Sequence, residues 1–436
     1  MSRLRILVLA PDCNPDGITN PLIGYCHAEA LARLHDVTLV TNPLSEDALR
    51  RANAPFRAVE VIRMRRTEYI QEWVRRIFKF NFRNQVLTAL SVPFSIAFEC
   101  GAWRQLRQRI SAGEFDAVLR LLPISTITPS PFSFYLRKGP IPFVVGPING
   151  GLPWPQGFSQ ADNQKQWISP LRGLYRLVPF ARSTYRCAAA IIAGSSHTCS
   201  ELGAYRDKVF YVPENGLSRW IVSGNLRGSS NSGKLELIFL GALVPFKACD
   251  LALRAAAPLL RSDLARFTVV GDGPERNRLE QLTRSIGIEK AVTFLGSVSH
   301  SEALKSLGLA DVLVFPSVHE FGGAVVIEAL AAGAVPVVAD FGGPGDTVRP
   351  DVGFKVPLRS ESDAVSHIET ILTCLAHDRD LLESLRQHGM SYARESFSWD
   401  AKAQVVTRII DWAVGQGPKP QLPPPTALAA GGGSSR

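Results

Sequence analysis

The sequence predicts an α/β protein with two successive Rossmann-like domains. Its 436 residues are too many for one ordinary hydrophobic core, and 46% apolar with 20% charged residues is typical of a globular chain. Short apolar runs alternate with segments of helical spacing in two series, which is the pattern of parallel sheets covered by helices. A polar stretch of Gly, Ser and Asn at 224–234 lies between the two series and has the composition of a linker.

The first domain is expected to span 1–222. A helix is predicted at 25–34, and a mostly helical segment at about 54–113 is expected to be inserted between strands. The short apolar runs of this half predict buried strands at 5–10, 36–41, 115–121, 142–145 and 188–193.

The second domain is expected to span 234–395, followed by a helix at 396–414. The tail 415–436 is rich in Pro and then in Gly and Ser, so it cannot pack a core and is expected to be disordered. Helices are predicted at about 249–260 and 274–286, and strands at 235–240, 267–270, 292–295, 311–315 and 335–339. Ligands bind at the carboxyl ends of parallel strands, so two such sheets offer two facing sites and suit transfer between two substrates.

The seven cysteines are scattered and include no Cys-x-x-Cys pair, which argues against a disulfide framework and against a structural zinc site. The apolar run near the amino terminus stops at Pro11 and is too short for a signal peptide. The longest apolar stretch, 86–98, contains Pro93 and is too short to cross a bilayer. We therefore expect a cytoplasmic protein with no segment that crosses a membrane.

The net charge of +9 is concentrated in one basic and aromatic stretch at 63–83. One interpretation is a solvated helix face. The other is a peripheral contact with anionic lipid at the inner membrane face, where each cation adds about 1 kcal/mol. Nucleic acid is not expected as a partner, because no nucleic-acid motif accompanies the charge. The residues of this stretch are Arg63, Arg65, Arg66, Arg75, Arg76, Lys79 and Arg83, interleaved with Trp73, Phe78, Phe80 and Phe82.

The most informative segment, 316–333, follows a predicted buried strand and opens a helix. Glu320 lies just before this helix, and two glycines follow in its first turn, where free backbone N–H groups favour an oxygen-rich ligand. Glu328 lies in an otherwise apolar stretch, where a buried carboxylate needs a partner. A ligand diol such as a ribose would supply one. The structural alternative is that Glu320 caps the helix and that Glu328 meets an arginine or a backbone amide.

Glu320 and Glu328, with seven residues between them in the setting Glu-Phe-Gly-Gly and Glu-Ala-Leu, resemble the Glu-x7-Glu signature of the retaining glycosyltransferases of family 4. The resemblance is strong from about 235 to 348 and collinear elsewhere. It implies the GT-B fold, in which two Rossmann-like domains face each other across a cleft. Other segments similar to the family are its Gly-Arg-Leu-x-x-x-Lys loop, its Gly-x-Gly-Pro turn, a strand with its glycine loop and the start of the last helix, at 241–247, 271–274, 336–343 and 397–399.

This resemblance implies transfer of a sugar from a nucleoside-diphosphate sugar to a hydroxyl acceptor, such as a lipid-linked or polysaccharide glycan, with retention of configuration. Glu320 would contact the transferred sugar, and Lys247 would neutralise the diphosphate leaving group, so these are the expected catalytic residues. Taken alone, Lys247 would be interpreted as an exposed lysine at a helix start. Glu328 would hold the ribose, and the other donor-binding residues would be Phe321, Gly322, Gly323, Ala324, Gly241, Gly271 and Gly273. No metal or cofactor is expected, because the chain shows no Asp-x-Asp motif in the setting of the metal-dependent glycosyltransferase fold.

The first domain would bind the acceptor. Asn149 and Gly150 follow a predicted strand, and their polar, glycine-rich setting fits either a ligand contact or a tight turn. Thr19 and Asn20 follow the first strand, where the family carries Gly-Gly. These four residues are the predicted acceptor or cleft residues.

Three further sites depart from the family pattern. Ala242 replaces an arginine, Ala248 replaces the usual glycine, and the segment 120–125 lacks a histidine that many relatives carry. Arg219 and Arg254 are candidates to replace the missing cation.

Three other functions compete with this interpretation. A nucleotide-sugar 2-epimerase of the same fold would need additional acid and base residues. A catalytically degenerate subunit that binds but does not transfer is favoured by Ala242. A dinucleotide oxidoreductase is disfavoured, because no Gly-x-Gly-x-x-Gly follows the first strand.

Overall fold

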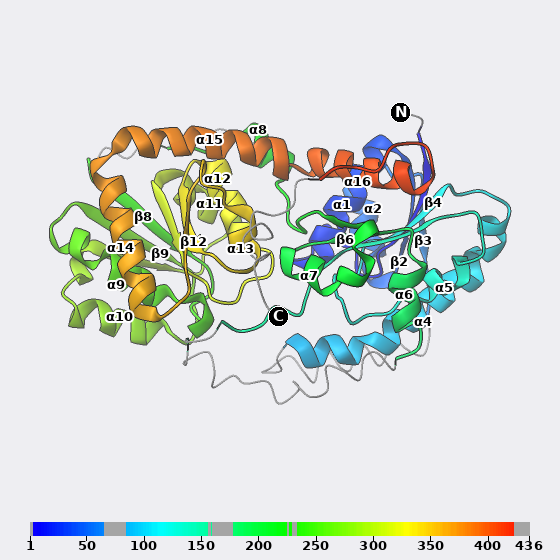
Figure 1. Cartoon of the computed structure of the whole chain (residues 1–436), viewed down its shortest axis with the longest axis horizontal. Coiled ribbons are helices and arrows are strands. Elements are labelled where there is room, and N and C mark those ends of the chain that lie inside the picture. Colours follow the sequence, from blue (N-terminus) through cyan, green and yellow to red (C-terminus); the bar gives the residue numbers. More distant parts are fainter. Residues whose placement is uncertain are drawn as a thin grey trace, which may run out of the picture. The chain divides into compact units, whose positions relative to one another are not determined.

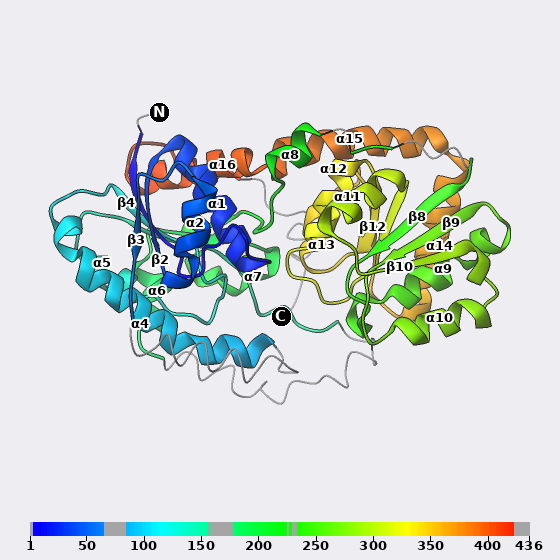
Figure 2. The same cartoon turned by 180° about the vertical axis from the view of Figure 1, so that it is seen from behind.

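The computed structural model describes residues 3–64, 84–155, 158, 178–224, 226–228 and 233–422. It contains two compact α/β units, each built on one parallel sheet (Figures 1 and 2). The first unit holds the described parts of 1–151, 167–214 and 399–423. The second unit holds the described parts of 152–166 and 215–398.

The sheet of the first unit has the strand order β3-β2-β1-β4-β5-β6-β7, and all of its neighbours pair in parallel. Every residue of Ile6–Leu9 is buried, because Ile6 and Val8 point into the core under one layer of helices and Leu7 and Leu9 into the core under the other. The strands are β1 (Arg5–Leu9), β2 (Asp36–Thr41), β3 (Ala58–Val61), β4 (Ala117–Arg120), β5 (Phe143–Ile148), β6 (Ala190–Ala193) and β7 (Val209–Tyr211).

Two pairs of helices supply the cores on the two faces of this sheet. The helices α1 (Asn20–Leu34) and α16 (Trp399–Ala413) pack on one face, and α4 (Asn84–Ser111) and α5 (Pro131–Leu136) pack on the other. The remaining helices of the unit are η1 (Pro43–Ser45), α2 (Glu46–Ala52), α6 (Ala181–Cys187), α7 (Ser196–Glu201) and η4 (Gly203–Lys208).

A buried lysine attaches α16 to the first unit. Lys402 is only 2% exposed, and its Nζ donates to the backbone carbonyl of Pro213. Burial lowers the pKa of Lys402 to about 7, and the neighbouring Glu214 opposes this shift. Two polar contacts with α1 and the residue that follows it add to the attachment, from Arg33 to Asp400 at 2.8 Å and from His35 to Thr407 at 2.8 Å.

The sheet of the second unit has the order β10-β9-β8-β11-β12-β13, again with parallel neighbours. The strands are β8 (Leu235–Leu240), β9 (Ala265–Val270), β10 (Val292–Gly296), β11 (Val312–Phe315), β12 (Val335–Ala339) and β13 (Phe354–Val356). The helices are α8 (Arg219–Ser223), η5 (Pro245–Lys247), α9 (Cys249–Arg261), α10 (Arg276–Ser285), η6 (Glu289–Ala291), α11 (His300–Leu309), α12 (Ala324–Ala332), α13 (Gly342–Thr347), α14 (Glu361–His377) and α15 (Arg379–Phe397).

The two parallel-sheet units confirm the fold class predicted from the alternating pattern. The segment 54–113, predicted to be mostly helical, contains β3 as well as α4, because Ala58–Val61 is a half-buried edge strand without a continuous apolar run. Of the basic and aromatic residues in the stretch at 63–83, Arg63 alone lies within the described residues, and it pairs with Glu46 at 3.0 Å.

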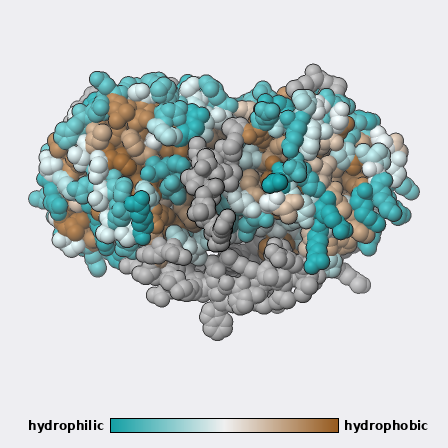
Figure 3. Space-filling view, in the orientation of Figure 1, coloured by the Kyte–Doolittle hydropathy of each residue, from teal (hydrophilic) through white to brown (hydrophobic). Residues whose placement is uncertain are grey.

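The tail predicted to be disordered from 415 onward is described as far as 422, and Leu422 packs against the core of the first unit. Residues 423–436 lie outside the described residues. On the face drawn in Figure 3, hydrophilic side chains cover much of the outer surface of each unit, as helices with one buried face require. None of the helices in the described part of the chain combines the length and apolar character of a transmembrane span.

Candidate active site

The predicted donor residues gather in the loops that leave the carboxyl edge of the second sheet. Gly241 follows β8, Gly271 follows β9, and Glu320 lies in the loop between β11 and α12. Because all six strands described in this sheet run parallel, these loops emerge at the same edge. This is the edge at which open α/β sheets bind their ligands.

The two predicted catalytic residues are in direct contact. The Nζ of Lys247, the last residue of η5, forms an ion pair with Oε2 of Glu320. Both side chains are mostly withdrawn from solvent, 16% exposed for Lys247 and 21% for Glu320, and the ammonium lies 4.8 Å from the centre of the Phe315 ring. The interpretation of Lys247 as an exposed surface lysine is therefore wrong.

The first turn of α12 lies beside this ion pair. Gly323 takes a left-handed conformation (φ 59°) at the helix N-cap, and no side chain caps the helix, so Glu320 is not the cap. The loop before α13 packs closely against it, with Gly343 N donating to the carbonyl of Glu320 at 3.1 Å. Phe321 and Gly322 are half-buried and Ala324 is exposed. Among the described residues, no side chain accepts a hydrogen bond from the first-turn N–H groups of α12. The ammonium of Lys247 lies close to this helix start through its contact with Glu320. Free N–H groups beside a cation are what a helix start needs to bind an anion.

The carboxylate of Glu328 is partly exposed and has a side-chain partner. Its side chain is 19% exposed, and Oε1 lies 2.9 Å from Nε2 of His300, the first residue of α11. The partner that the structure gives this carboxylate is a histidine, not the arginine or backbone amide of the structural alternative, and a contact with a ribose stays a prediction. Spacing along the chain does not reveal this pair, because the two residues belong to different helices and meet only when β10 and β11 are placed in one sheet.

We expect Glu328→Gln to lower the pKa of His300, which NMR titration of its ring protons would measure. The hydrogen bond to the Glu328 carboxylate raises the pKa of His300 above its ordinary value, and partial burial opposes this effect. Since the folded pKa is the higher one, the stabilisation from this pair is present below the ordinary pKa of about 6.5 and is lost as the pH rises through the folded pKa. An unchanged titration of His300 in Glu328→Gln would contradict the contact.

Gly271 and Gly273 have a structural role that is independent of any ligand. A Cβ on Gly271, whose φ is 131°, would lie 2.0 Å from the carbonyl oxygen of Gly241, and one on Gly273 would lie 2.4 Å from that of Leu243. The loops after β8 and β9 thus run in backbone contact, with Leu243 N donating to Asp272 O at 2.9 Å. Their contact with a donor, like that of Gly241, stays a prediction.

Ala248, which follows Lys247, takes the left-handed conformation with φ 52°. The left-handed conformation costs a residue with a Cβ about 1–2 kcal/mol, and glycine avoids this cost. Glycine also makes the unfolded chain more flexible, which lowers the stability by about 0.4–1 kcal/mol and offsets part of the gain. We therefore expect Ala248→Gly to raise the free energy of unfolding by about 0.5 kcal/mol in a urea titration. The control is Ala256→Gly, a buried position within α9, where glycine should destabilise by about 1 kcal/mol. Equal losses in both variants would contradict the strain at Ala248.

The two arginines considered as replacements for the missing cation lie on two helices of the second unit. Arg254 lies on α9 and approaches Asp250 at 3.9 Å, and Arg219 begins α8 at an exposed position. Ala242 is exposed in the loop after β8. Lys247 is thus the cation that the described residues place beside Glu320.

In the first unit, Asn149 organises a tight turn after β5. Its Oδ1 accepts hydrogen bonds from Ser195 Oγ at 2.8 Å, Thr198 Oγ1 at 3.1 Å and Gly150 N at 3.0 Å, and the residue is 6% exposed. These contacts support the tight-turn interpretation. Thr19 and Asn20 are exposed at the start of α1. A role of these four residues toward an acceptor stays a prediction.

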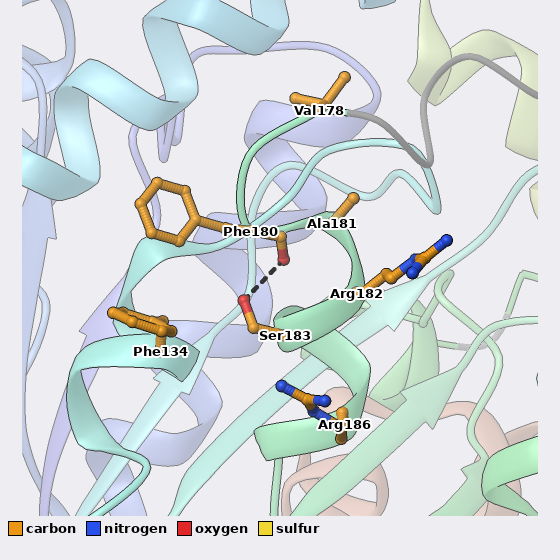
Figure 4. Close-up of a pocket in the computed structure, with 7 residues that line it drawn as sticks. All are labelled: Phe134, Val178, Phe180, Ala181, Arg182, Ser183 and Arg186. Atoms are coloured by element: carbon orange, nitrogen blue, oxygen red, sulfur yellow. Dashed lines mark hydrogen bonds between the residues drawn. The ribbon is translucent and has the colours of Figure 1, made fainter.

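The first unit also has a pocket of about 360 Å³ between α5 and α6. Figure 4 shows Phe134 and Phe180 on one side of it and the two α6 residues Arg182 and Arg186 on the other, with Ser183 donating to the carbonyl of Phe180 at 2.9 Å. None of the predicted site residues lines this pocket.

The architecture is the GT-B fold, shared with solved glycosyltransferase structures. The chain is similar to a glycosyltransferase from Rickettsia africae, with a TM-score of 0.61, 14% identity and coverage of 95% of this chain and 99% of the other. It is also similar to HepE of Anabaena, solved in complex with UDP, with a TM-score of 0.60, 17% identity and coverage of 94% and 100%. At such identities the similarity shows the fold alone.

The match to a family model lies in the second unit. Residues 227–388, which include Lys247, Glu320 and Glu328, match the family model of the Glycosyl transferases group 1. The chain is 28% identical over 242 residues to an uncharacterized glycosyltransferase of Methanocaldococcus jannaschii, covering 52% of this chain and 60% of that protein. It is 36% identical over 176 residues to the D-inositol 3-phosphate glycosyltransferase of Geodermatophilus obscurus, covering 38% and 37%. The chain spans about half the length of the curated relatives it matches.

Proposed function

We propose that this protein is a retaining glycosyltransferase that moves a sugar from a nucleoside-diphosphate sugar to a hydroxyl acceptor. The observation that carries the proposal is the contact between Lys247 and Glu320 beside the uncapped start of α12. A sugar nucleotide presents a diphosphate and sugar hydroxyls on neighbouring atoms. A cation for the diphosphate next to a carboxylate for the hydroxyls, with helix N–H groups at hand, fits that pattern of charge.

In the proposed reaction the bond between C1 of the donor sugar and the diphosphate oxygen breaks. A bond forms between C1 and the acceptor hydroxyl oxygen on the same face of the sugar, and the hydroxyl proton passes to an oxygen of the leaving diphosphate. Negative charge grows on that leaving group, and a fixed ammonium beside it stabilises the transition state more than the ground state. Lys247 would supply this charge, and Glu320 would hold the transferred sugar.

Glu328 is proposed to bind the ribose hydroxyls of the donor. Its carboxylate is partly exposed, and one oxygen, Oε1, is engaged by His300. A carboxylate has about four lone-pair sites, so a hydroxyl pair can still be accepted beside the histidine. The hydrogen bond from His300 would fix the orientation of the carboxylate before the nucleotide arrives.

The test is thermal stabilisation by a panel of nucleoside diphosphates and nucleotide sugars, measured on the full chain and on Glu328→Ala. A ligand at one hundred times its dissociation constant should add about 2.7 kcal/mol to the stability. The matched control is Glu369→Ala, since Glu369 is a half-exposed glutamate within α14. We expect one nucleotide to stabilise the chain and the control variant but not Glu328→Ala.

Three outcomes would contradict the proposal. A folded protein that no nucleotide stabilises would favour a degenerate subunit, for which the exposed Ala242 in place of the family arginine is the supporting observation. If a nucleotide sugar is a substrate, NMR of the product gives the configuration at C1. A product with inverted configuration would exclude the retaining mechanism, and an epimerised free nucleotide sugar would identify an epimerase.

A further inference from the structure

The segment 152–155, which is distant in sequence from Lys247 and Glu320, packs against the loops that carry them. Residues 152–155 belong to the second unit, although the strand before them, β5, belongs to the first. The carbonyl of Leu152 lies 3.1 Å from Nε2 of His319, and the indole of Trp154 stacks on the same imidazole with ring centres 4.2 Å apart and planes 18° apart. His319 is the residue directly before Glu320.

The same indole also reaches the residue directly before Lys247. The ring centres of Trp154 and Phe246 are 6.3 Å apart with planes at 80°, and Phe246 meets His319 in a similar edge contact at 6.4 Å. The carbonyl of Phe246 accepts a hydrogen bond from Val318 N at 2.9 Å, which holds the loops after β8 and β11 together. Trp154 therefore touches the chain neighbours of both members of the ion pair.

Leu152 extends this contact to the loop before α13. A Cβ on Gly342 would lie 3.0 Å from Cδ2 of Leu152 and 2.2 Å from the carbonyl oxygen of Glu320. The segment thus adjoins three loops at the carboxyl edge of the sheet, and two of its contacts are made with His319 and Phe246, the chain neighbours of Glu320 and Lys247.

We infer that Trp154 is a positioning residue, which sets the relative placement of Lys247 and Glu320 through Phe246 and His319. The inference rests on the proposed function of the ion pair. Lysine and glutamate have long side chains whose placement depends on the backbone that carries them, and ordering such side chains costs conformational entropy. A stacked aromatic residue orders that backbone with only two side-chain torsions. Because a displacement of about 1 Å can cost about 100-fold in rate, a residue that fixes both loops has a large effect without touching substrate.

The test is a double-mutant cycle between Trp154→Ala and Lys247→Ala, with turnover measured under nucleotide-sugar saturation. We expect Trp154→Ala alone to lower kcat about 10-fold to 30-fold, with KM for the donor changed less than threefold. In the Lys247→Ala background the same change should lower kcat less than twofold, because the group that it positions is gone. Trp154→Phe should restore most of the rate, and Tyr392→Ala, which removes a half-buried aromatic ring packed on Phe397, should leave it unchanged.

The outcomes separate this inference from the proposed function. A full, additive loss from Trp154→Ala in the Lys247→Ala background would overturn the positioning role and leave the proposed function intact. A rate that Lys247→Ala does not change would instead reject the role given to the ion pair. A readout without substrate is the Lys247 Cε–Hε NMR resonance, assigned by its absence in Lys247→Arg. In Trp154→Ala it should move toward the position of a solvent-exposed lysine, and an unmoved resonance would overturn the inference.

Discussion

Turnover of Lys247→Ala with its nucleotide sugar is expected to fall by about 10²–10³-fold, which is the effect of removing one fixed charge from a transition state that develops an anion. The affinity for the nucleoside diphosphate should fall by less, about 10-fold, because the leaving group gains negative charge as the bond to C1 breaks. Steady-state kinetics together with calorimetric titration of the nucleoside diphosphate would separate the two quantities. The partly buried ion pair with Glu320 provides the geometric reason for this expectation.

The matched control is Lys234→Ala. Lys234 is similarly withdrawn from solvent, 21% exposed, and pairs with a carboxylate, Asp263, but it precedes β8 and so lies at the opposite edge of the same sheet. Its loss should leave turnover within twofold of the unmodified protein. If Lys247→Ala also keeps its turnover, the role of Lys247 toward the diphosphate is wrong.

The free energy of unfolding is expected to rise with pH between about 7 and 9, by up to about 1.4 kcal/mol per pH unit from Lys402 alone. Lys402 has a pKa of about 7 in the folded chain, because burial disfavours its charged form, whereas an unfolded lysine keeps a pKa of about 10.4. Between these values the unfolded state binds the additional proton, so raising the pH favours the folded state. Urea titrations at several pH values would measure the slope.

Comparison with Lys402→Met isolates this contribution from the other groups that titrate in the same range. The variant should lack the part of the slope that Lys402 contributes, while Lys305→Met, at an exposed position of α11, should keep it. Identical slopes in the unmodified chain and Lys402→Met would show that Lys402 stays protonated in the folded chain. In that case Glu214 would dominate over burial.

The sequence predicts well those elements whose limits follow from their own residues. β2 at Asp36–Thr41 and β8 at Leu235–Leu240 have the predicted limits, because each is an apolar run buried on both faces of a sheet. β3 was missed because an edge strand is half-exposed, and its Glu60 breaks the apolar run. β7 and β13 were missed because three residues are too few to show a period.

The candidate site was predictable only in part, for a related reason. The sequence pattern placed Glu320 just before a helix and Glu328 within it, which is local information. The partners of both lie in other loops, Lys247 after β8 and His300 after β10, and no spacing in one chain reports such a contact. Trp154 has the weakest sequence signal of these contacts, since it is a single aromatic residue that follows β5, a strand of the other unit.

The first unit joins segments of the chain that are made before and after most of the second unit, and this has a consequence for how the protein folds during synthesis. Residues up to 214 leave the ribosome early, yet the core that they form is completed by α16, whose Trp399, Val406 and Ile410 side chains are buried in it. The second unit, built almost entirely from 215–398, is synthesised in between. At about 5–20 residues per second, the first unit would wait on the order of 10–40 s with one face of its core covered by α1 but not yet by α16. The usual order, in which the amino-terminal domain folds first, would be reversed here, and nascent chains that stop before α16 should depend on chaperones.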